Sequence, residues 1–247
     1  MTAEEMLGIV RNQLAIDLNC AAEDLSGPKD HIVFVEAADN PGRRPFRRGR
    51  QFFEMLTMGQ SIVVSATPAR LAYAREQLRG LSRDEALAMP FIRGHAMHFL
   101  PDLGRVGPLP APEGFDYERV TGDGLEALRA LKGFDCATQR DREHPVQAEY
   151  AWVARRDGAA VAMATAFVWA PRMRSIGVDV LPEYRGRGLA AYLANEATQD
   201  ALGRDIVPVY ATSCSNLASQ RVAHRVGYAV AWVSDQRLRF EGGLSNA

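Results

Sequence analysis

The sequence contains little cysteine and no long apolar run. Its 247 residues include three cysteines, Cys20, Cys136 and Cys214, which are odd in number and far apart. This pattern argues against both a disulfide framework and a zinc site, and reduced thiols are typical of cytoplasmic proteins. The longest nearly apolar stretch, residues 159–170, is too short to cross a bilayer, which takes about 20 residues. We therefore expect a cytoplasmic protein without a metal and without a membrane partner.

The sequence also lacks an excess of charge. The formal net charge is −1, which gives no overall attraction to nucleic acid or anionic lipid. Residues 1–13 lack the basic start and apolar run of a signal peptide. One local exception is the stretch GRRPFRRGR at residues 42–50. An RNA-associated protein could use this Arg43–Arg50 loop, but runs of charge are usually solvated, so we do not expect nucleic acid to bind.

A segment rich in proline and glycine divides the sequence. Residues 101–114 include Pro101, Pro108, Pro110 and Pro112, which suit neither a helix nor a central strand. We predict an N-terminal α/β accessory domain at 1–100, a linker at 101–114 and a second domain at 115–247. A chain of this length has room for two small domains.

Apolar periodicity predicts alternating helices and strands, and hence an α/β (α+β) fold class. In the N-terminal part we predict helices at 4–18 and 69–79 and strands at 31–37 and 61–66. In the C-terminal part we predict helices at 123–131, 189–202 and 217–226 and strands at 150–155, 159–169, 175–180, 206–212 and 228–234. The dipeptide Asp157-Gly158 predicts a hairpin turn between two of these strands.

The most informative stretch is SIGVDVLPEYRGRGLAA at residues 175–191. An apolar strand leads through a turn containing Arg185, Gly186, Arg187 and Gly188 into a helix. Such a turn can present free backbone N–H groups and the positive end of the helix dipole to a phosphate. Taken alone, the pattern fits a solvated strand-to-helix turn equally well. It is neither a Walker loop nor a dinucleotide fingerprint.

A second motif follows about 26 residues later. The stretch NLASQRVAHRVGY begins at Asn216, contains Ser219 and reaches Gly227 and Tyr228. On its own it predicts a helix with an asparagine N-cap and a glycine C-cap.

Together the two motifs resemble the acyl-CoA motifs of the GNAT superfamily of N-acetyltransferases. The first resembles a strand leading into [QR]-x-x-G-x-[GA], and the second resembles N-x-x-[AS] before a helix that ends in G-[FY]. The resemblance covers about residues 114–240. The first hundred residues resemble, loosely, the extra N-terminal domain of two-domain bacterial members.

The resemblance implies a mixed, mainly antiparallel sheet flanked by helices, and acetyl-CoA as co-substrate. It implies that backbone N–H groups in the first motif hold the pyrophosphate. It further implies that the strand before this motif pairs with the pantetheine arm, and that the second motif contacts that arm. The implied cofactor-binding residues are Val178, Asp179, Val180, Arg185, Gly186, Arg187, Gly188, Leu189, Ala190, Ala191, Asn216 and Ser219.

The catalytic acid and base are not marked. Many members of the superfamily carry a tyrosine that acts as general acid, seven residues after the motif asparagine. This sequence has Ala223 at that position. Tyr210, Tyr228, Ser219 or water remain alternatives. Glu149, just before a predicted strand, is the candidate general base, although glutamate at such a position is more often solvated.

The leading hypothesis is direct transfer of an acetyl group from acetyl-CoA to a small-molecule or protein amine. One alternative is a non-catalytic acyl-CoA-binding module, which the missing acid and base favour. The other is the RNA-associated protein described above. A homodimer is possible, since the sequence does not determine the oligomeric state.

Overall fold

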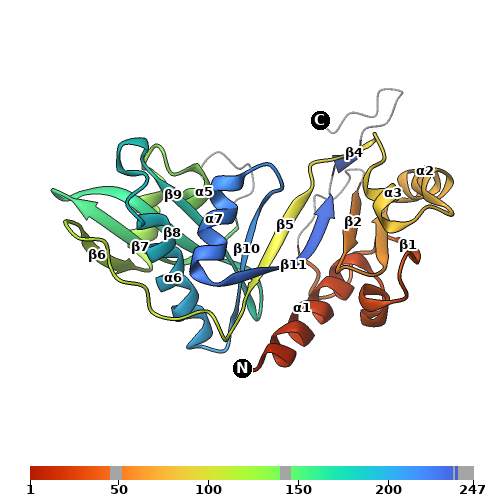
Figure 1. The fold of residues 1–247 in the computed structure, drawn as a ribbon, viewed down its shortest axis with the longest axis horizontal. Helices are drawn as coiled ribbons and strands as arrows, with labels where there is room; N and C mark the ends of the chain where they lie inside the picture. The colour runs from red at the N-terminus through yellow and green to blue at the C-terminus, as the bar shows by residue number, and fades with distance from the viewer. Residues whose placement is uncertain (45–51, 140–145, 236, 239–247) are drawn as a thin grey trace. The chain divides into compact units, whose positions relative to one another are not determined.

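The structure is a computed structural model that describes residues 1–44, 52–139, 146–235 and 237–238 (Figure 1). The chain forms two compact units, each built from several segments. The first contains residues 1–6, 99–211 and 216–229, and the second contains residues 7–98, 212–215 and the described residues from 230 on. These units differ from the expected boundaries. The expected linker at 101–114 lies inside the first unit, and most of the last long strand belongs to the second.

The first unit contains a mixed sheet with the strand order β10-β9-β8-β7-β6. Its strands are β6 (Asp116–Val120), β7 (Ala148–Arg156), β8 (Ala159–Ala170), β9 (Met173–Val180) and β10 (Val207–Ser213). The pairs β6–β7, β7–β8 and β8–β9 are antiparallel, whereas β10 pairs with β9 in parallel. Asp157 and Gly158 both have positive φ, as the predicted hairpin turn requires. The expected mixed, mainly antiparallel sheet is therefore confirmed.

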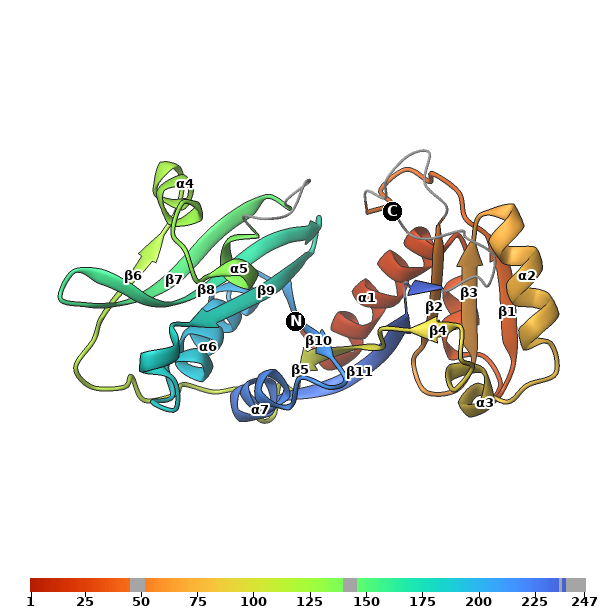
Figure 2. The same ribbon diagram turned by 90° about the horizontal axis from the view of Figure 1, so that it is seen from above.

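Helices cover both faces of this sheet, because side chains alternate along its strands. On one face, Ala151 and Met163 pack with helix α4 (Asp123–Arg129) and the short α5 (Asp135–Thr138). The neighbouring Tyr150 points to the other face, where its hydroxyl donates to the carbonyl oxygen of Ala197 at 2.8 Å. Ala197 belongs to α6 (Leu189–Leu202). Figure 2 shows α4 and α5 on one side of the sheet and α6 on the other.

The two helices that carry the sequence motifs have the predicted bounds. α6 spans Leu189–Leu202 and buries Leu193, Ala197 and Ala201, while α7 spans Leu217–Val226. Gly227 ends α7 with φ +100°, a conformation that favours glycine. Gly203 ends α6 in a right-handed conformation instead, so that helix stops without a left-handed cap.

The second unit is a smaller α/β layer. Its elements are α1 (Ala3–Leu18, shared at its start with the first unit), η1 (Ala22–Ser26), β1 (Ile32–Glu36), β2 (Phe53–Thr57), β3 (Ile62–Ala66), α2 (Pro68–Leu78), α3 (Arg83–Leu87) and β4 (Ile92–Arg93). β3 pairs with β1 in parallel and with β2 antiparallel. β11 (Tyr228–Asp235) pairs with β2 through Val233–Asp235, and β12 (Arg237–Leu238) pairs with β4. β5 (Ala96–Pro101) passes from this unit into the first. The helices and strands predicted for this part are confirmed, whereas η1, β2, α3, β4, β5 and β12 were not predicted.

Gly177 in β9 tests how tightly α5 is packed onto the sheet. A methyl group at this position would overlap the carbonyl oxygen of Cys136 and lie 3.1 Å from Cε2 of Phe167. We expect Gly177→Ala to lower the free energy of unfolding by about 1–3 kcal/mol, measured by urea denaturation. Gly8→Ala in α1 is the matched control, because no atom lies within 4 Å of the added methyl. The control should be neutral or stabilising, by up to about 1 kcal/mol. Equal stability of the two variants would contradict the packing argument.

Candidate functional site

The site begins where β9 and β10 stop pairing. Their parallel ladder runs from Met173 and Val207 to Ile176 and Tyr210. Beyond it, Gly177–Val180 keep their partners on β8, and among the described residues they have no partner on the β10 side. This edge of β9 therefore offers backbone donors and acceptors to an extended ligand, in the manner of strand addition. The two strands therefore diverge after Ile176 and Tyr210.

The turn after β9 presents free backbone donors. Gly186 and Gly188 have φ of +78° and +86°, and the first helical bond of α6 is from Tyr192 N–H to the Gly188 carbonyl. Among the residues that the structure describes, the N–H groups from Gly186 to Ala191 have no backbone acceptor. Free N–H groups at the start of a helix of this length form an anion site.

Arginine side chains surround the same turn. Arg185 donates through Nε to the Val180 carbonyl at 3.1 Å, so it holds the turn in shape. The guanidinium of Arg187 lies 5.5 Å from the ring centre of Tyr184. Arg225 of α7 comes within 3.9 Å of the position that a side chain on Gly188 would occupy. This third cation, which α7 brings to the turn, was not predicted from the sequence.

Asp179, expected among the cofactor-binding residues, attaches α5 to β9. Its Oδ2 accepts the backbone N–H groups of Cys136 at 2.7 Å and Ala137 at 2.8 Å. Burial raises the pKa of this carboxyl above its usual value, against the opposing effect of these hydrogen bonds. The carboxylate thus holds the helix that covers this part of the sheet, while the backbone of Asp179 remains on the open edge of β9.

The second motif forms the N-cap that its sequence predicts. Oδ1 of Asn216 accepts the N–H of Ser219 at 3.1 Å. The hydroxyl of Ser219 lies 2.9 Å from that of Tyr210. Ala223, two turns into α7, is fully buried. Tyr228 is also fully buried, and its hydroxyl lies 2.7 Å from that of Thr198.

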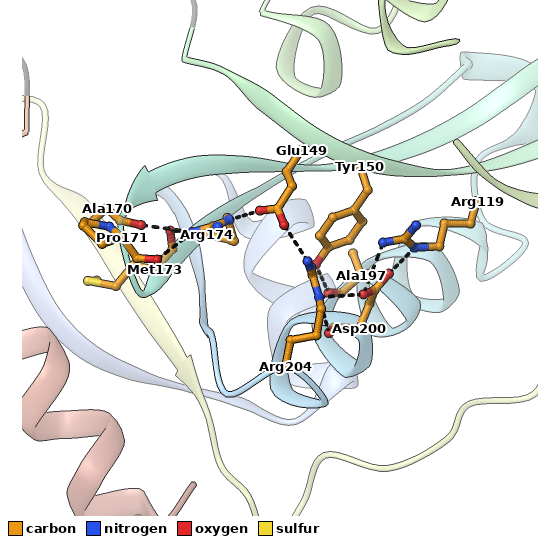
Figure 3. Close-up of polar contacts among 10 residues, drawn as sticks. All are labelled: Arg119, Glu149, Tyr150, Ala170, Pro171, Met173, Arg174, Ala197, Asp200 and Arg204. Carbon is orange, nitrogen blue, oxygen red and sulfur yellow. Dashed lines mark hydrogen bonds and ion pairs between the residues drawn. The ribbon is translucent and has the colours of Figure 1, made fainter. Parts of the chain in front are cut away.

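Glu149, the expected general base, is held between two arginines (Figure 3). It sits at a bulge in β7, and its two oxygens accept from Arg174 and Arg204. Burial acts to raise the pKa of the Glu149 carboxyl, but the hydrogen bonds and charges of the two arginines outweigh it, and the pKa lies below its usual value. A carboxylate with two cationic partners and a lowered pKa is a poor proton acceptor near neutral pH. The geometry does not support the prediction of a general base at this position.

The ion pairs continue around Tyr150. Arg204 also pairs with Asp200, Nε to Oδ1, at 3.1 Å, and Asp200 accepts from Arg119. The guanidinium carbons of Arg119 and Arg204 lie 4.8 and 4.7 Å from the ring centre of Tyr150. Figure 3 shows this ring between the two guanidinium groups. The cluster links β6, β7, β9 and α6, so its role is structural.

A pocket of about 430 Å³ opens on the other face of the sheet, between α4, α5, β7 and β8. Its volume suits a small organic molecule. Thr165, on its floor, is 2% exposed, and its hydroxyl has no partner among the described residues. Thr165 is paired in the sheet with Gly177, the first residue of β9 beyond the β10 ladder. Other lining residues include Leu125, Glu126, Leu128, Arg129, Gln147, Glu149, Met163 and Phe167.

The described residues contain neither a metal cluster nor a membrane-spanning helix. Within the described ranges, no group of three or more His, Cys, Asp or Glu side chains is placed to hold a metal ion. In the same ranges no helix is both long and apolar enough to cross a membrane. None of the three cysteines forms a disulfide.

Comparison with known proteins identifies this part of the chain. Residues 125–228 match the family model described as "Acetyltransferase (GNAT) family". These residues are a GNAT domain. The match runs from α4 to the start of β11 and includes both motifs. No curated protein matches the chain.

Solved structures of GNAT proteins also resemble the chain. A GNAT-family acetyltransferase from Novosphingobium aromaticivorans is 25% identical over 60% of this chain and 66% of its own, just under two thirds, with a TM-score of 0.43. A GCN5-related N-acetyltransferase-like protein from Streptococcus suis is 18% identical over 96% of this chain and 100% of its own, with a TM-score of 0.46. An aminoglycoside N-acetyltransferase in complex with CoA is 22% identical over 53% and 97%, with a TM-score of 0.36.

The ion pairs of Glu149 predict how stability depends on pH. Because its pKa is lowered in the fold, Glu149 contributes stability above its unfolded pKa of about 4.3, and this is lost as pH falls through the folded pKa. We expect Glu149→Gln to lower the free energy of unfolding by about 1 kcal/mol at pH 7, and by progressively less below pH 4. Denaturant unfolding of both proteins across pH 3–7 measures this. Glu118→Gln removes a more exposed ion pair with Arg155 and should have a smaller effect. A difference that does not change with pH would rule out the ionic explanation.

The burial of Ala223 predicts the effect of restoring the tyrosine that related enzymes carry. A tyrosine at this fully buried position would overpack the buried face of α7. We expect Ala223→Tyr to destabilise the fold by about 1–3 kcal/mol and to lower any acetyl transfer. Ala218→Tyr, at an exposed position of the same helix, is the control and should leave stability nearly unchanged. A stable Ala223→Tyr variant with faster turnover would show that the position is a vacant acid site.

Proposed function

We propose that the protein transfers an acetyl group from acetyl-CoA to a small-molecule amine. The observation that carries the proposal is the continuity of the open edge of β9 with the free N–H groups of the following turn. Residues 177–180 can pair with the extended pantetheine arm, and residues 186–191 can bind the pyrophosphate. Arg187 and Arg225 supply positive charge beside the same turn.

The sheet geometry also offers a means of activating the thioester. Backbone N–H groups on the open edge of β9 can donate to its carbonyl oxygen as negative charge develops there, an effect worth about 3 kcal/mol for one such donor. The pocket under α4 and α5 would hold the amine, since Thr165 on its floor lies beside Gly177 in the sheet. In this proposal the reaction depends mainly on positioning a neutral amine beside the thioester.

The sequence leaves two other functions open. A non-catalytic acyl-CoA-binding module would need the same turn and edge, and the ion pairs of Glu149 favour it. An RNA-associated function has less support, because Arg44 is paired with Asp17 and Arg43 donates to the Ala38 carbonyl at 2.8 Å. The remaining residues of that loop, 45–50, lie outside the described residues.

An acetylation screen against a library of small amines, read by release of free CoA, tests the proposal. Turnover with any amine supports transfer. Binding of CoA without turnover on any amine, including peptide amines, would favour the binding module. Absence of CoA binding would contradict both.

The glycine turn at residues 185–188, called the phosphate turn below, gives a sharper prediction. A side chain on Gly188 would have room, since the nearest atom is Cγ of Pro112 at 3.6 Å. Both Asn and Asp tolerate the positive φ at this position better than other residues. We expect Gly188→Asp to weaken CoA binding at least about tenfold more than Gly188→Asn, because only the first adds negative charge beside phosphate. Calorimetry of CoA binding by both folded variants measures this. Equal affinities of the two variants for CoA would show that no phosphate of CoA binds at this turn.

A further inference from the structure

The hydroxyls of Tyr210 and Ser219 form a pair at the point where β9 and β10 part. Tyr210 is the last residue of β10 that pairs with β9, opposite Ile176. Its hydroxyl is 2.9 Å from that of Ser219 in the first turn of α7. Tyr210 is 2% exposed, whereas Ser219 is half-buried. Of the two hydroxyls, that of Ser219 is therefore the one that a ligand along the open edge of β9 can reach.

Both members of the pair are fixed by their surroundings. The ring of Tyr210 packs edge-on against Phe99, with 6.5 Å between ring centres, and tilted against Tyr228 at 5.9 Å. Ser219 is fixed at its backbone by the Asn216 cap. Because neither group must be ordered during a reaction, a hydrogen bond from Ser219 is preorganised.

The direction of the hydrogen bond follows from the phenol's protonation. Burial raises the pKa of Tyr210 to about 12. The bond with Ser219 acts to lower it, and nearby Cys136 and Asp179 act to raise it. The phenol therefore keeps its proton and can donate to the Ser219 oxygen. Ser219 is then free to direct its own proton outward.

The other groups that could assist the departing sulfur are out of reach. Ala223 has no polar atom in its side chain, and it is fully buried. The Tyr228 hydroxyl is fully buried against Thr198. Of Tyr210, Ser219 and Tyr228, only Ser219 is not buried.

We propose that Ser219, oriented by Tyr210, donates a hydrogen bond to the sulfur of acetyl-CoA as the C–S bond breaks. This inference rests on the proposed acetyl transfer. The amine nitrogen forms the new C–N bond, the C–S bond breaks, and sulfur leaves with its electron pair. The nitrogen loses a proton to water, and the thiolate later takes one from water. Ser219 stabilises the charge on sulfur and loses no proton, and Tyr210 acts as a positioning residue.

Titration of the bound CoA thiol tests this without an acceptor amine. Thiolate absorbance is followed against pH for the protein with CoA, and the same titration with desulfo-CoA is subtracted to remove the protein's own thiols and phenols. In the wild-type protein, the pKa of the bound thiol should be about one unit below that in Ser219→Ala. Tyr210→Phe should cause part of this rise, and Ser219→Thr, which keeps a hydroxyl, should restore the wild-type value.

Tyr228→Phe is the matched control, because it removes a buried phenol hydroxyl that also has one hydroxyl partner. It should leave the pKa of the bound thiol unchanged. A bound thiol with the same pKa in Ser219→Ala and wild type would overturn the inference while leaving the proposed function intact. Failure of wild-type protein to bind CoA would instead overturn the proposed function.

With an amine from the screen, Ser219→Ala should lower kcat roughly 10- to 100-fold at unchanged CoA affinity. Tyr210→Phe should lower it by less, roughly 2- to 10-fold. Loss of CoA affinity in Ser219→Ala with unchanged kcat would mean that the hydroxyl binds the arm and does not assist the sulfur.

Discussion

The parallel ladder between β9 and β10 ends at Ile176 and Tyr210, although β9 continues to Val180. In a sheet, an unpaired row of N–H and C=O groups must find partners in water or in a ligand. Here the row leads directly into a turn whose N–H groups are also unpaired. The phosphate turn, the motif at Asn216 and the pair formed by Tyr210 and Ser219 all adjoin this opening. Each of the roles proposed for them depends on this opening.

An opening in a sheet weakens it, and the neighbouring strands carry the compensating contacts. On the side of α6, Tyr150 lies between Arg119 and Arg204, and the acidic side chains of Glu149 and Asp200 balance these charges. On the opposite face, Asp179 holds α5 through two backbone N–H groups. Partly buried ion pairs depend on satisfying both partners, so we regard the cluster as one cooperative unit.

The sequence predicted the parts of the site that depend on local backbone chemistry. The glycine turn, α6, and α7 with its cap were predictable, because helix periodicity, capping residues and glycine act over a few residues. The roles of Glu149 and Asp179 were not predictable. Their partners, Arg204 and the N–H of Cys136, lie 55 and 43 residues away in the chain. The short α5 and strand β6 were also missed, because segments this short do not show a reliable apolar period. The expected domain boundaries followed prolines, whereas the actual units follow the pairing of β11 with β2.

The proposed binding sites for the two substrates are formed by different elements of the fold. The pocket is built largely from α4, α5, β7 and β8, whereas the phosphate turn belongs to α6. Four of the lining residues, Leu125, Glu126, Leu128 and Arg129, come from α4, a helix that contributes nothing to the phosphate turn. If the pocket holds the amine as proposed, substitutions in this short helix can change which amine is accepted while the residues of both CoA motifs stay the same. The two motifs alone would then not indicate the acceptor.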